Sequence, residues 1–550
     1  MFIVFEGIDG SGKTTLSGKV AEILTAQGLS VHQARPQGEL KSRLAGDIRT
    51  LARDPRNLTM SPHTELFLFI ARDTQTIDTV IRPQLQKAQV VIADRYLYSA
   101  QVLCRARGEV SAEEIDTAVD VAARGLWPDL VVYCDVDIDT SALRKSIDKI
   151  VNPRAPEDFG RKGLRGLGLR DAMRNVYLDL AAQNPDTWFT VDNAHASIQE
   201  NTYKIANRIL ELAGKPPVEL PSAAPSHEAL PETPNRTPED SQTAFYDYLR
   251  RLTAAGRPAE AAYHLRSLNS EEAWDLRAQL VDTVPDAIVY GLLPLSCERA
   301  LEMRRRLIDK VPGRVARSLG AVWGDADEEA WEMRRSLARK VPIDVACSFG
   351  SLDTEPAWEL REMLVSEAGI LVLSTLKGMD FERAWAFREK WGKKKNIPGL
   401  LKGLARLDTE RAWALRNKHK KNALPWFILS LSGLETDESW KLRSTYLENA
   451  TKLVIRSIPS FSDLDTAWDL RRKAAPWAKE AITTIKGIDS HNAWALRRDF
   501  MDRWPGAAAK SVGMTLALTD KGLGFLTELA EKNPGNPDVL HYLVKAIESR

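Results

Sequence analysis

Short apolar runs alternate with amphipathic stretches over residues 1–215. The runs at 2–5, 90–93 and 130–134 are rich in β-prone side chains and have the length of buried strands. Residues 15–25 instead have a helical period, with apolar side chains on one face: Leu16, Val20, Ile23 and Leu24. This alternation predicts an α/β domain whose parallel sheet is covered by helices on both faces.

A proline-rich segment follows this first part of the chain. Residues 216–240 hold seven prolines among Ser, Ala and Glu. Such a composition cannot bury enough apolar surface to order itself, so it predicts an extended linker. The sequence therefore predicts a first domain at 1–215, a linker at 216–240 and a second domain at 241–550.

The second domain repeats the motif Ala-Trp-x-Leu-Arg. The first copy is Ala273–Arg277, a later copy at Ala300–Arg304 has Leu in place of Trp, and nine copies follow one another at intervals of 26 to 30 residues. The remaining copies, with small variations, surround the following residues: Trp331, Trp358, Trp385, Trp413, Trp440, Trp468 and Trp494. A repeat of this length predicts an all-α solenoid of stacked αα-hairpins.

Local signals place two short helices in each repeat. Asp353-Thr354 and Asp408-Thr409 precede motif copies and are typical of helix N-caps. In the early copies a proline follows the motif at 285, 312 and 342, and a second helix can start there, such as residues 343–349. The motif is absent after Thr519, as expected of a terminal cap.

The recurring Trp and Arg allow two interpretations. In the first, Trp packs between neighbouring hairpins while Arg bonds carbonyls or an acidic cap of the preceding repeat. In the second, the arginines line a concave surface for phosphate or nucleic acid. Residues 241–550 hold 48 basic and 42 acidic side chains, which is too dilute an excess for a nucleic-acid track. The charge therefore favours a protein partner for the solenoid.

Composition restricts the remaining classes. No apolar stretch approaches the length of a membrane span, and the first residues lack the basic segment of a signal peptide. The four cysteines are scattered without a CxxC pair, as in a reducing compartment, so we expect a cytoplasmic protein. The net charge of +1 predicts no general attraction to membranes or nucleic acid.

Residues 7–14 fit the phosphate-binding pattern G-x-x-x-x-G-K-[ST], between the first predicted strand and the first predicted helix. In that position, backbone N–H groups and a helix N-terminus face a bound phosphate. Lys13 would reach the β- and γ-phosphates of ATP, and the Thr14 hydroxyl would hold Mg²⁺. The predicted nucleotide-binding residues are Gly7, Asp9, Gly10, Ser11, Gly12, Lys13, Thr14 and Thr15.

Further segments make residues 1–212 resemble thymidylate kinases. Residues 5–15 are close to the opening of that family, and Asp94-Arg95-Tyr96 followed by Ser99 is similar to its DRY-x-x-S segment. Other similar segments are Leu66–Phe69, Ile81–Pro83, Pro128–Leu130 with Asp135 and Arg144, and Arg174 with Tyr177. The resemblance implies a P-loop nucleoside-monophosphate kinase that uses ATP and Mg²⁺, with oligomers possible through this domain.

The resemblance also implies residue roles. Arg95 would hold the acceptor phosphate, Asp9 would contact the acceptor sugar, and Asp94 would join Thr14 at the metal. The loop at 154–170 is rich in Arg and Gly like a closing lid, with Arg161 as the family's lid arginine and Arg165 next; the alternative is a solvated basic loop. The predicted acceptor residues are Asp9, Phe69, Asp73, Arg95 and Ser99.

The sequence departs from the family around the acceptor base. Phe69 stands where the family stacks a Phe on thymine, but the Arg expected four residues later is replaced by Asp73, with Arg72 before it. Residues 102–104 and 35–38 also depart from the family's pattern. The leading hypothesis is a kinase acting on dTMP or another pyrimidine nucleotide, with the solenoid as a docking or regulatory domain. The alternatives are a nucleotide-operated switch that signals through the solenoid and a nucleic-acid-binding solenoid.

Overall fold

The computed structural model describes residues 1–35, 40–54, 57–58, 60–151, 166–194, 196–220, 238–320 and 328–549. Contacts divide the chain into two compact units, one made of residues 1–148 and 154–228 and the other of 149–153 and 229–550. The predicted linker lies mostly outside the described residues. At one end of it, the Asn207 side-chain amide donates to the Val218 carbonyl and accepts from the Val218 N–H. At the other end, helix α10 already begins at Pro238.

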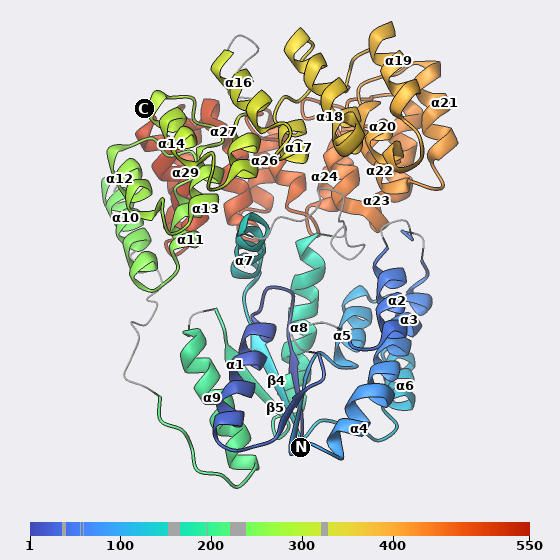
Figure 1. The fold of residues 1–550 in the computed structure, drawn as a ribbon, viewed down its shortest axis with the longest axis vertical. Coiled ribbons are helices and arrows are strands. Elements are labelled where there is room, and N and C mark those ends of the chain that lie inside the picture. The colour runs from blue at the N-terminus through green and yellow to red at the C-terminus, as the bar shows by residue number, and fades with distance from the viewer. Residues whose placement is uncertain are drawn as a thin grey trace. The chain divides into compact units, whose positions relative to one another are not determined.

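The first unit is built on a parallel sheet of five strands in the order β2-β3-β1-β4-β5 (Figure 1). The strands are β1 Phe2–Glu6, β2 Val31–Gln33, β3 Val90–Asp94, β4 Leu130–Asp135 and β5 Trp188–Asp192. The helices are α1 Lys13–Ala26, α2 Arg43–Arg53, α3 Pro62–Thr76, α4 Arg82–Leu85, α5 Tyr98–Arg107, α6 Ala112–Ala123, α7 Ile138–Val151, α8 Leu167–Gln183 and α9 Ile198–Leu212, with a π-helical turn at Ile77–Ile81. The predicted strands and the first helix are confirmed, as is the α/β class.

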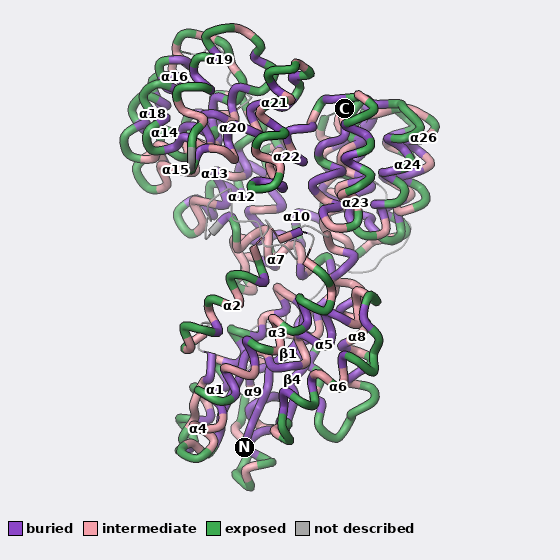
Figure 2. The backbone as a smooth tube through the Cα atoms, turned by 90° about the vertical axis from the view of Figure 1, so that its right-hand side faces the viewer, coloured by how far each residue is buried: buried purple, intermediate pink, exposed green. Residues whose placement is uncertain are grey.

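Successive residues of β1 point to opposite faces of the sheet, so the strand takes part in two apolar cores. Phe2 and Val4 pack with residues of α3, α5 and α6, whereas Ile3 and Phe5 pack with residues of α1 and α9. The central strand β1 is buried along its length, and β4 is buried as far as Cys134 (Figure 2). This burial on both faces explains why the strands read as continuous apolar runs.

The second unit is all helical. Its helices are α10 Pro238–Ala254, α11 Pro258–His264, α12 Glu271–Leu280, α13 Pro285–Leu292, α14 Glu298–Leu307, α15 Pro312–Ser318, α16 Glu328–Leu337, α17 Pro342–Ala346, α18 Glu355–Ser374, α19 Glu382–Trp391, α20 Ile397–Gly403, α21 Glu410–His419, α22 Leu424–Ser430, α23 Asp437–Ser457, α24 Asp465–Ala474, α25 Glu480–Thr483, α26 His491–Asp499, α27 Pro505–Ala517, α28 Asp520–Lys532 and α29 Pro537–Glu548. The helix expected at 343–349 is α17, which ends at Ala346, where the chain continues as turns.

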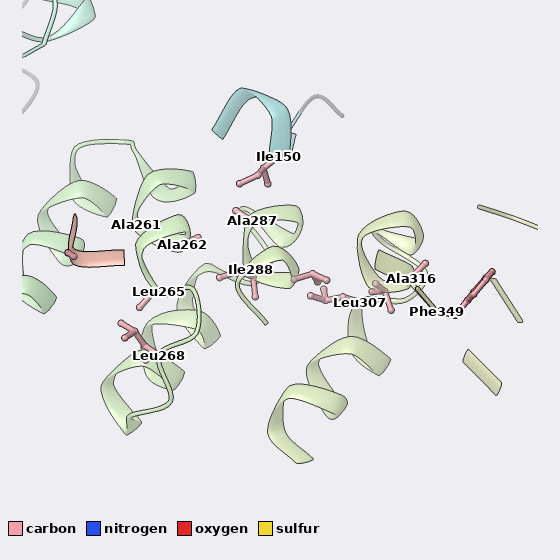
Figure 3. Close-up of a cluster of buried hydrophobic side chains, with 14 of the residues drawn as sticks. Ile150, Ala261, Ala262, Leu265, Leu268, Ala287, Ile288, Leu307, Ala316 and Phe349 are labelled. Carbon is pink, nitrogen blue, oxygen red and sulfur yellow. The ribbon is translucent and has the colours of Figure 1, made fainter. Parts of the chain in front are cut away.

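Each motif copy lies on a helix and is followed by a second helix that packs on the second helices of its neighbours. In α18 and α23, the two helices of a pair are joined across a kink, at Ala368 and Ala450. We call the second helix of each pair its inner helix. The apolar core along the inner helices contains Ala261, Leu265, Ala287, Ile288, Leu307 and Ala316 (Figure 3). The cap expected at Thr409 is confirmed, since its hydroxyl accepts from the N–H of Ala412, but the hydroxyl of Thr354 makes no such bond.

The arginine of every motif is buried and bonds backbone carbonyls. Arg416, for example, donates to the carbonyls of Leu404 (2.7 Å) and Leu407 (2.8 Å) and lies 4.8 Å from the centre of the Trp413 ring. The nine motif arginines have at most 2% of their surface exposed: Arg277, Arg304, Arg334, Arg361, Arg388, Arg416, Arg443, Arg471 and Arg497. The interpretation in which these arginines line a ligand surface is therefore wrong, because their guanidinium groups are engaged inside the helix pairs.

The first and last helices of this unit pack on each other. Helix α29 contacts α10 and α11, so the series of inner helices returns to its start. The Tyr246 hydroxyl donates to Glu548 (2.6 Å), Arg266 pairs with Asp538 (2.8 Å), and the His541 ring lies 2.9 Å from the His264 carbonyl. The segment after Thr519, predicted as a terminal cap of the solenoid, thus packs on the first helices of the unit and closes a circuit of helices.

Candidate active site

The glycine loop joins β1 to α1 as predicted. Gly7 and Gly12 have φ values of 144° and 83°, which side chains disfavour. A Cβ on Gly7 would lie 2.6 Å from the Cys134 carbonyl oxygen, and one on Gly12 would lie 2.4 Å from Nδ2 of Asn193. These positions therefore require glycine for both conformation and space.

Side chains of helix α7 and of the turn after β5 hold the glycine loop in place. The Asn193 side chain, just after β5, donates to the Ser11 carbonyl (2.6 Å), and the Ser141 hydroxyl donates to the Asp9 carbonyl (2.8 Å). Arg144 in turn donates to the Asn193 carbonyl (2.6 Å). Asn193 and Ser141 were missed in the sequence; their only signal is that polar residues follow the ends of β5 and β4, where parallel sheets place their sites.

Lys13 is the first residue of α1 and is buried under the loop. Its ammonium donates to the Ile8 carbonyl (2.8 Å) and to the Ser11 hydroxyl (3.2 Å). Burial, followed by the positive charge of Arg95, lowers the pKa of Lys13 to about 8. A negative ligand in the loop would offset both effects and keep this ammonium charged.

Thr14 and Asp94 form the candidate metal position. The Thr14 hydroxyl donates to Oδ2 of Asp94, at 2.6 Å, from the first turn of α1 to the end of β3. A hydroxyl and a carboxylate oxygen side by side fit Mg²⁺, which takes few protein ligands and completes its shell with phosphates and water. Among the described residues there is no cluster of three or more acidic, His or Cys side chains that could hold a metal. Thr15, predicted with this group, is exposed on the next position of α1.

Arg95 joins the glycine loop to Ser99, which was predicted to contact the acceptor. Its guanidinium donates to Asp9 (2.6 Å), to the Gly7 carbonyl (3.0 Å) and to the Ser99 hydroxyl (3.1 Å). Its φ of 77° is in the left-handed region, a conformation that costs a non-glycine residue about 1–3 kcal/mol. Although burial opposes the charge, Asp9 and other negative neighbours hold the pKa of Arg95 above its usual value. The structure thus brings the predicted residues Asp9, Arg95 and Ser99 together.

Glu6 holds this arrangement from below and was missed as a site residue. Its fully buried carboxylate accepts from the Tyr96 N–H (2.8 Å), the Ser99 hydroxyl (2.8 Å) and the Tyr177 hydroxyl (2.7 Å). It also lies 3.7 Å from Nη1 of Arg95. In the sequence, Glu6 looks like the polar end of an apolar strand, so nothing local distinguishes it from a surface residue.

Further arginines, Arg35, Arg49, Arg53 and Arg72, interact electrostatically with one another or with Arg95. Arg35 is buried, its Nε and Nη1 atoms have no hydrogen-bond partner among the described residues, and burial and Arg72 lower its pKa to about 10. Burial and the charges of Arg53, Arg72 and Arg95 lower the pKa of Arg49. Such a group of cations fits a phosphate better than an uncharged ligand.

The two residues that depart from the family at the predicted base position, Arg72 and Asp73, form an ion pair. Arg72 donates to both carboxylate oxygens of Asp73, at 2.7 and 2.6 Å, and both side chains are buried. The Arg72 guanidinium also lies 5.1 Å from the centre of the Phe69 ring. Asp73 is therefore occupied by Arg72, and Arg72 is the charged group placed against the predicted base-stacking ring.

The predicted lid arginines, Arg161 and Arg165, lie outside the described residues. Helix α8, which follows them, contributes Arg174, whose guanidinium donates to both oxygens of Asp135 at 2.8 Å. Arg174 and Asp135 both belong to the segments that resemble the family, and the structure shows them as an ion pair.

The first part of the chain is similar in sequence to known proteins. The thymidylate kinase family profile matches residues 5–205. A thymidylate kinase of Pelobacter propionicus is 33% identical over 212 residues, which are 38% of this chain and 94% of that protein. One of Oleidesulfovibrio alaskensis is 34% identical over 194 residues, 35% of this chain and 90% of that protein. A solved thymidylate kinase of Ehrlichia chaffeensis is 24% identical, with a TM-score of 0.28 over 38% of this chain and 98% of its own.

The glycine loop with Lys13 on one side and the arginines around Asp9 on the other define a P-loop kinase with a phosphorylated acceptor, a nucleoside-monophosphate kinase. The extent of the match to the curated relatives makes the assignment more specific. The chain belongs to the thymidylate kinase family. Its second unit lies beyond the matched residues, and no helix of the described residues is long and apolar enough to cross a membrane.

Proposed function

We propose that the first unit transfers the γ-phosphate of ATP to a pyrimidine nucleoside monophosphate, with dTMP as the leading substrate. The observation that carries this proposal is the position of Arg95. Its guanidinium bonds the glycine loop at Gly7 and the acceptor-side carboxylate of Asp9. A charge at that place can hold an acceptor phosphate in line with a donor phosphate in the loop.

The chain's residues divide the work of such a transfer. The loop N–H groups and Lys13 bind the donor phosphates, while Thr14 and Asp94 hold Mg²⁺. When bound, Mg²⁺ neutralises charge on the donor phosphates. Arg95, with Arg35 and Arg49, positions the acceptor phosphate, and Glu6 and Ser99 hold Arg95. Arg161 and Arg165 remain the predicted source of charge from the lid.

A coupled assay of ATP consumption across the common ribo- and deoxyribonucleoside monophosphates tests the proposal. We expect turnover with Mg²⁺ and a pyrimidine nucleotide, with dTMP among the accepted substrates. ATP binding without turnover of any monophosphate would sink the kinase proposal and favour the nucleotide-operated switch. A protein partner for the helical unit and oligomers through the kinase unit stay predictions.

Replacing Arg95 by alanine should lower kcat/KM for the monophosphate by about 10²-fold or more, the scale of losing one charge stabiliser. Steady-state kinetics with the monophosphate as the varied substrate measure this loss. The matched control is Arg208→Ala, because Arg208 lies on α9 and pairs with the exposed Glu211. Equal activity of the two variants would remove Arg95 from the site.

The Arg72–Asp73 pair makes a second prediction. If Asp73 acts by orienting Arg72 against the base, Arg72→Ala and Asp73→Ala should lower kcat/KM for dTMP by similar factors. The double variant should then lose little more than either single variant, because contacting residues do not act additively. Additive losses would instead mean that Asp73 contacts the base independently. Kinetics of the four proteins with dTMP decide between these outcomes.

A further inference from the structure

Positively charged side chains collect in the second unit, where its last helices pack on its own first helices. Arg266 follows α11, Lys479 and Lys486 flank α25, Lys510 lies on α27, and Lys545 lies on α29. Helix α25 packs on α27, α27 on α29, and α29 on α11, so these cations belong to consecutive neighbours in the circuit of helices. We call these five residues, together with Asp538, the closure cluster.

Several contacts fix the closure cluster in space. The N–H of Gly487 donates to the Ser511 carbonyl (3.0 Å), which brings the neighbouring residues Lys486 and Lys510 to adjoining turns. A Cβ on Gly513 would lie 3.2 Å from Cγ of Lys486. On the other side, Arg266 pairs with Asp538 at 2.8 Å and lies 4.3 Å from the centre of the Tyr263 ring.

The lysines of the closure cluster form no ion pair among the described residues, and the one carboxylate that faces Lys510, Asp538, is itself paired with Arg266. These lysines are Lys479, Lys486, Lys510 and Lys545. Burial and the neighbouring positive charges lower the pKa values of two of these lysines. Burial, then Lys486 and Arg266, lowers the pKa of Lys545 to about 8. Burial, then Arg266, Lys479 and Lys486, lowers the pKa of Lys510. Lys486 and Lys510 nevertheless reach solvent.

Many arginines of this unit are neutralised or satisfied. The motif arginines bond backbone carbonyls inside the helix pairs. Outer arginines form ion pairs with glutamates of the preceding repeat, as Arg299 does with Glu271 and Arg383 with Glu355. The lysines of the closure cluster differ from these arginines, because they form no such ion pair among the described residues. Uncompensated like charges held close together destabilise a fold unless a ligand offsets them.

We propose that the closure cluster binds a compact oligophosphate anion, either free or as the phosphate chain of a nucleoside triphosphate. Lysine ammonium groups are mobile point charges with three donors each, which suits several phosphate oxygens at once. The cations lie on or beside four helices that pack in succession, and Lys486 and Lys510 lie on adjoining turns. The excess of positive charge over residues 241–550 is small, so a short chain of phosphates fits these few cations better than an extended nucleic acid. Arg266, fixed by Asp538 and Tyr263, supplies the preorganised charge.

Calorimetric titration of the full-length protein with sodium tripolyphosphate tests this site. All proteins carry Lys13→Ala, so that the glycine loop contributes little. We expect one bound tripolyphosphate and an affinity that falls about tenfold or more in K510Q/K545Q, as for the loss of charge-assisted hydrogen bonds. The matched control is K418Q/K441Q, which removes two exposed lysines of the same unit.

Titrations with other ligands and with further variants distinguish the possible outcomes. Tighter binding of ATP or dTTP than of tripolyphosphate would identify a nucleotide as the natural source, and equal binding would identify the phosphate chain alone. K510R/K545R should bind like the parent, and Lys486→Gln should weaken binding, which covers the case that K510Q/K545Q does not fold. Absence of binding, equal losses in the control, or binding of an oligonucleotide but not of tripolyphosphate would overturn the proposal.

Discussion

Replacing Lys13 by alanine should lower phosphoryl transfer by about 10³-fold while leaving the fold intact. The ammonium is the only cation that the glycine loop itself supplies, and charge stabilisers of this kind contribute 10²–10³-fold each. The loss falls on the chemical step because negative charge develops on the leaving β-phosphate there. Single-turnover kinetics at saturating ATP would measure it, with circular dichroism to verify folding.

Lys19→Ala is the matched control, because Lys19 lies on the exposed side of the same helix. The pKa of Lys13 adds a pH signature. Above pH 8 the nucleotide-free enzyme loses this proton, which ATP binding must restore, so kcat/KM for ATP should fall as pH rises through 8. Lys13→Ala should lack this fall. Unchanged turnover in Lys13→Ala would contradict the assignment of the loop.

Replacing Arg388 by alanine should destabilise the helical unit by about 3–5 kcal/mol, as for breaking a buried charged group from its partners. Its guanidinium donates to the carbonyls of Leu376 (2.7 Å), Met379 (2.9 Å) and Gly403 (3.2 Å), which would all lose a buried partner. Burial lowers its pKa only to about 10, so the group carries its charge into the interior at neutral pH.

Trp385→Ala should cost a similar 3–5 kcal/mol, the range for truncating a large buried aromatic side chain. The Arg388 guanidinium lies 4.5 Å from the centre of that ring, so the double variant should lose less than the sum. Urea unfolding followed by circular dichroism measures each free energy. Arg383→Ala on the same helix is the control and should cost about 1 kcal/mol or less, because its pair with Glu355 is exposed. Equal costs for Arg383 and Arg388 would refute the structural role of the motif arginine.

The glycine loop and the strands around it could be predicted because their signals are local. Gly7 to Thr14 follow a continuous apolar run, and this order alone implies a phosphate site. Glu6 could not be found in the same way, because its role arises from Ser99 and Tyr177, which are far away in the sequence. Asp73 was expected to face the base, but its neighbour Arg72 takes both of its oxygens.

The motif arginines show the same limit in the second unit. Their spacing predicted helix pairs, but a charged residue beside an apolar seam suits either solvent or buried carbonyls. Only the position of the preceding loop, as with Leu404 and Leu407 around Arg416, decides between them. The meeting of α10 and α11 with α29 joins segments nearly three hundred residues apart and leaves no periodic trace.

The contact between the first and last helices of the second unit also restricts the number of repeats that this unit can hold. An open array tolerates the gain or loss of one repeat, since only the end moves. In a closed circuit each repeat turns the chain through a set share of a full rotation, so the number of repeats becomes a geometric constant. Removing one helix pair would leave Tyr246 and Arg266 out of reach of Glu548 and Asp538 unless every remaining joint bent further. This half of the chain is therefore expected to vary by substitution and not by copy number.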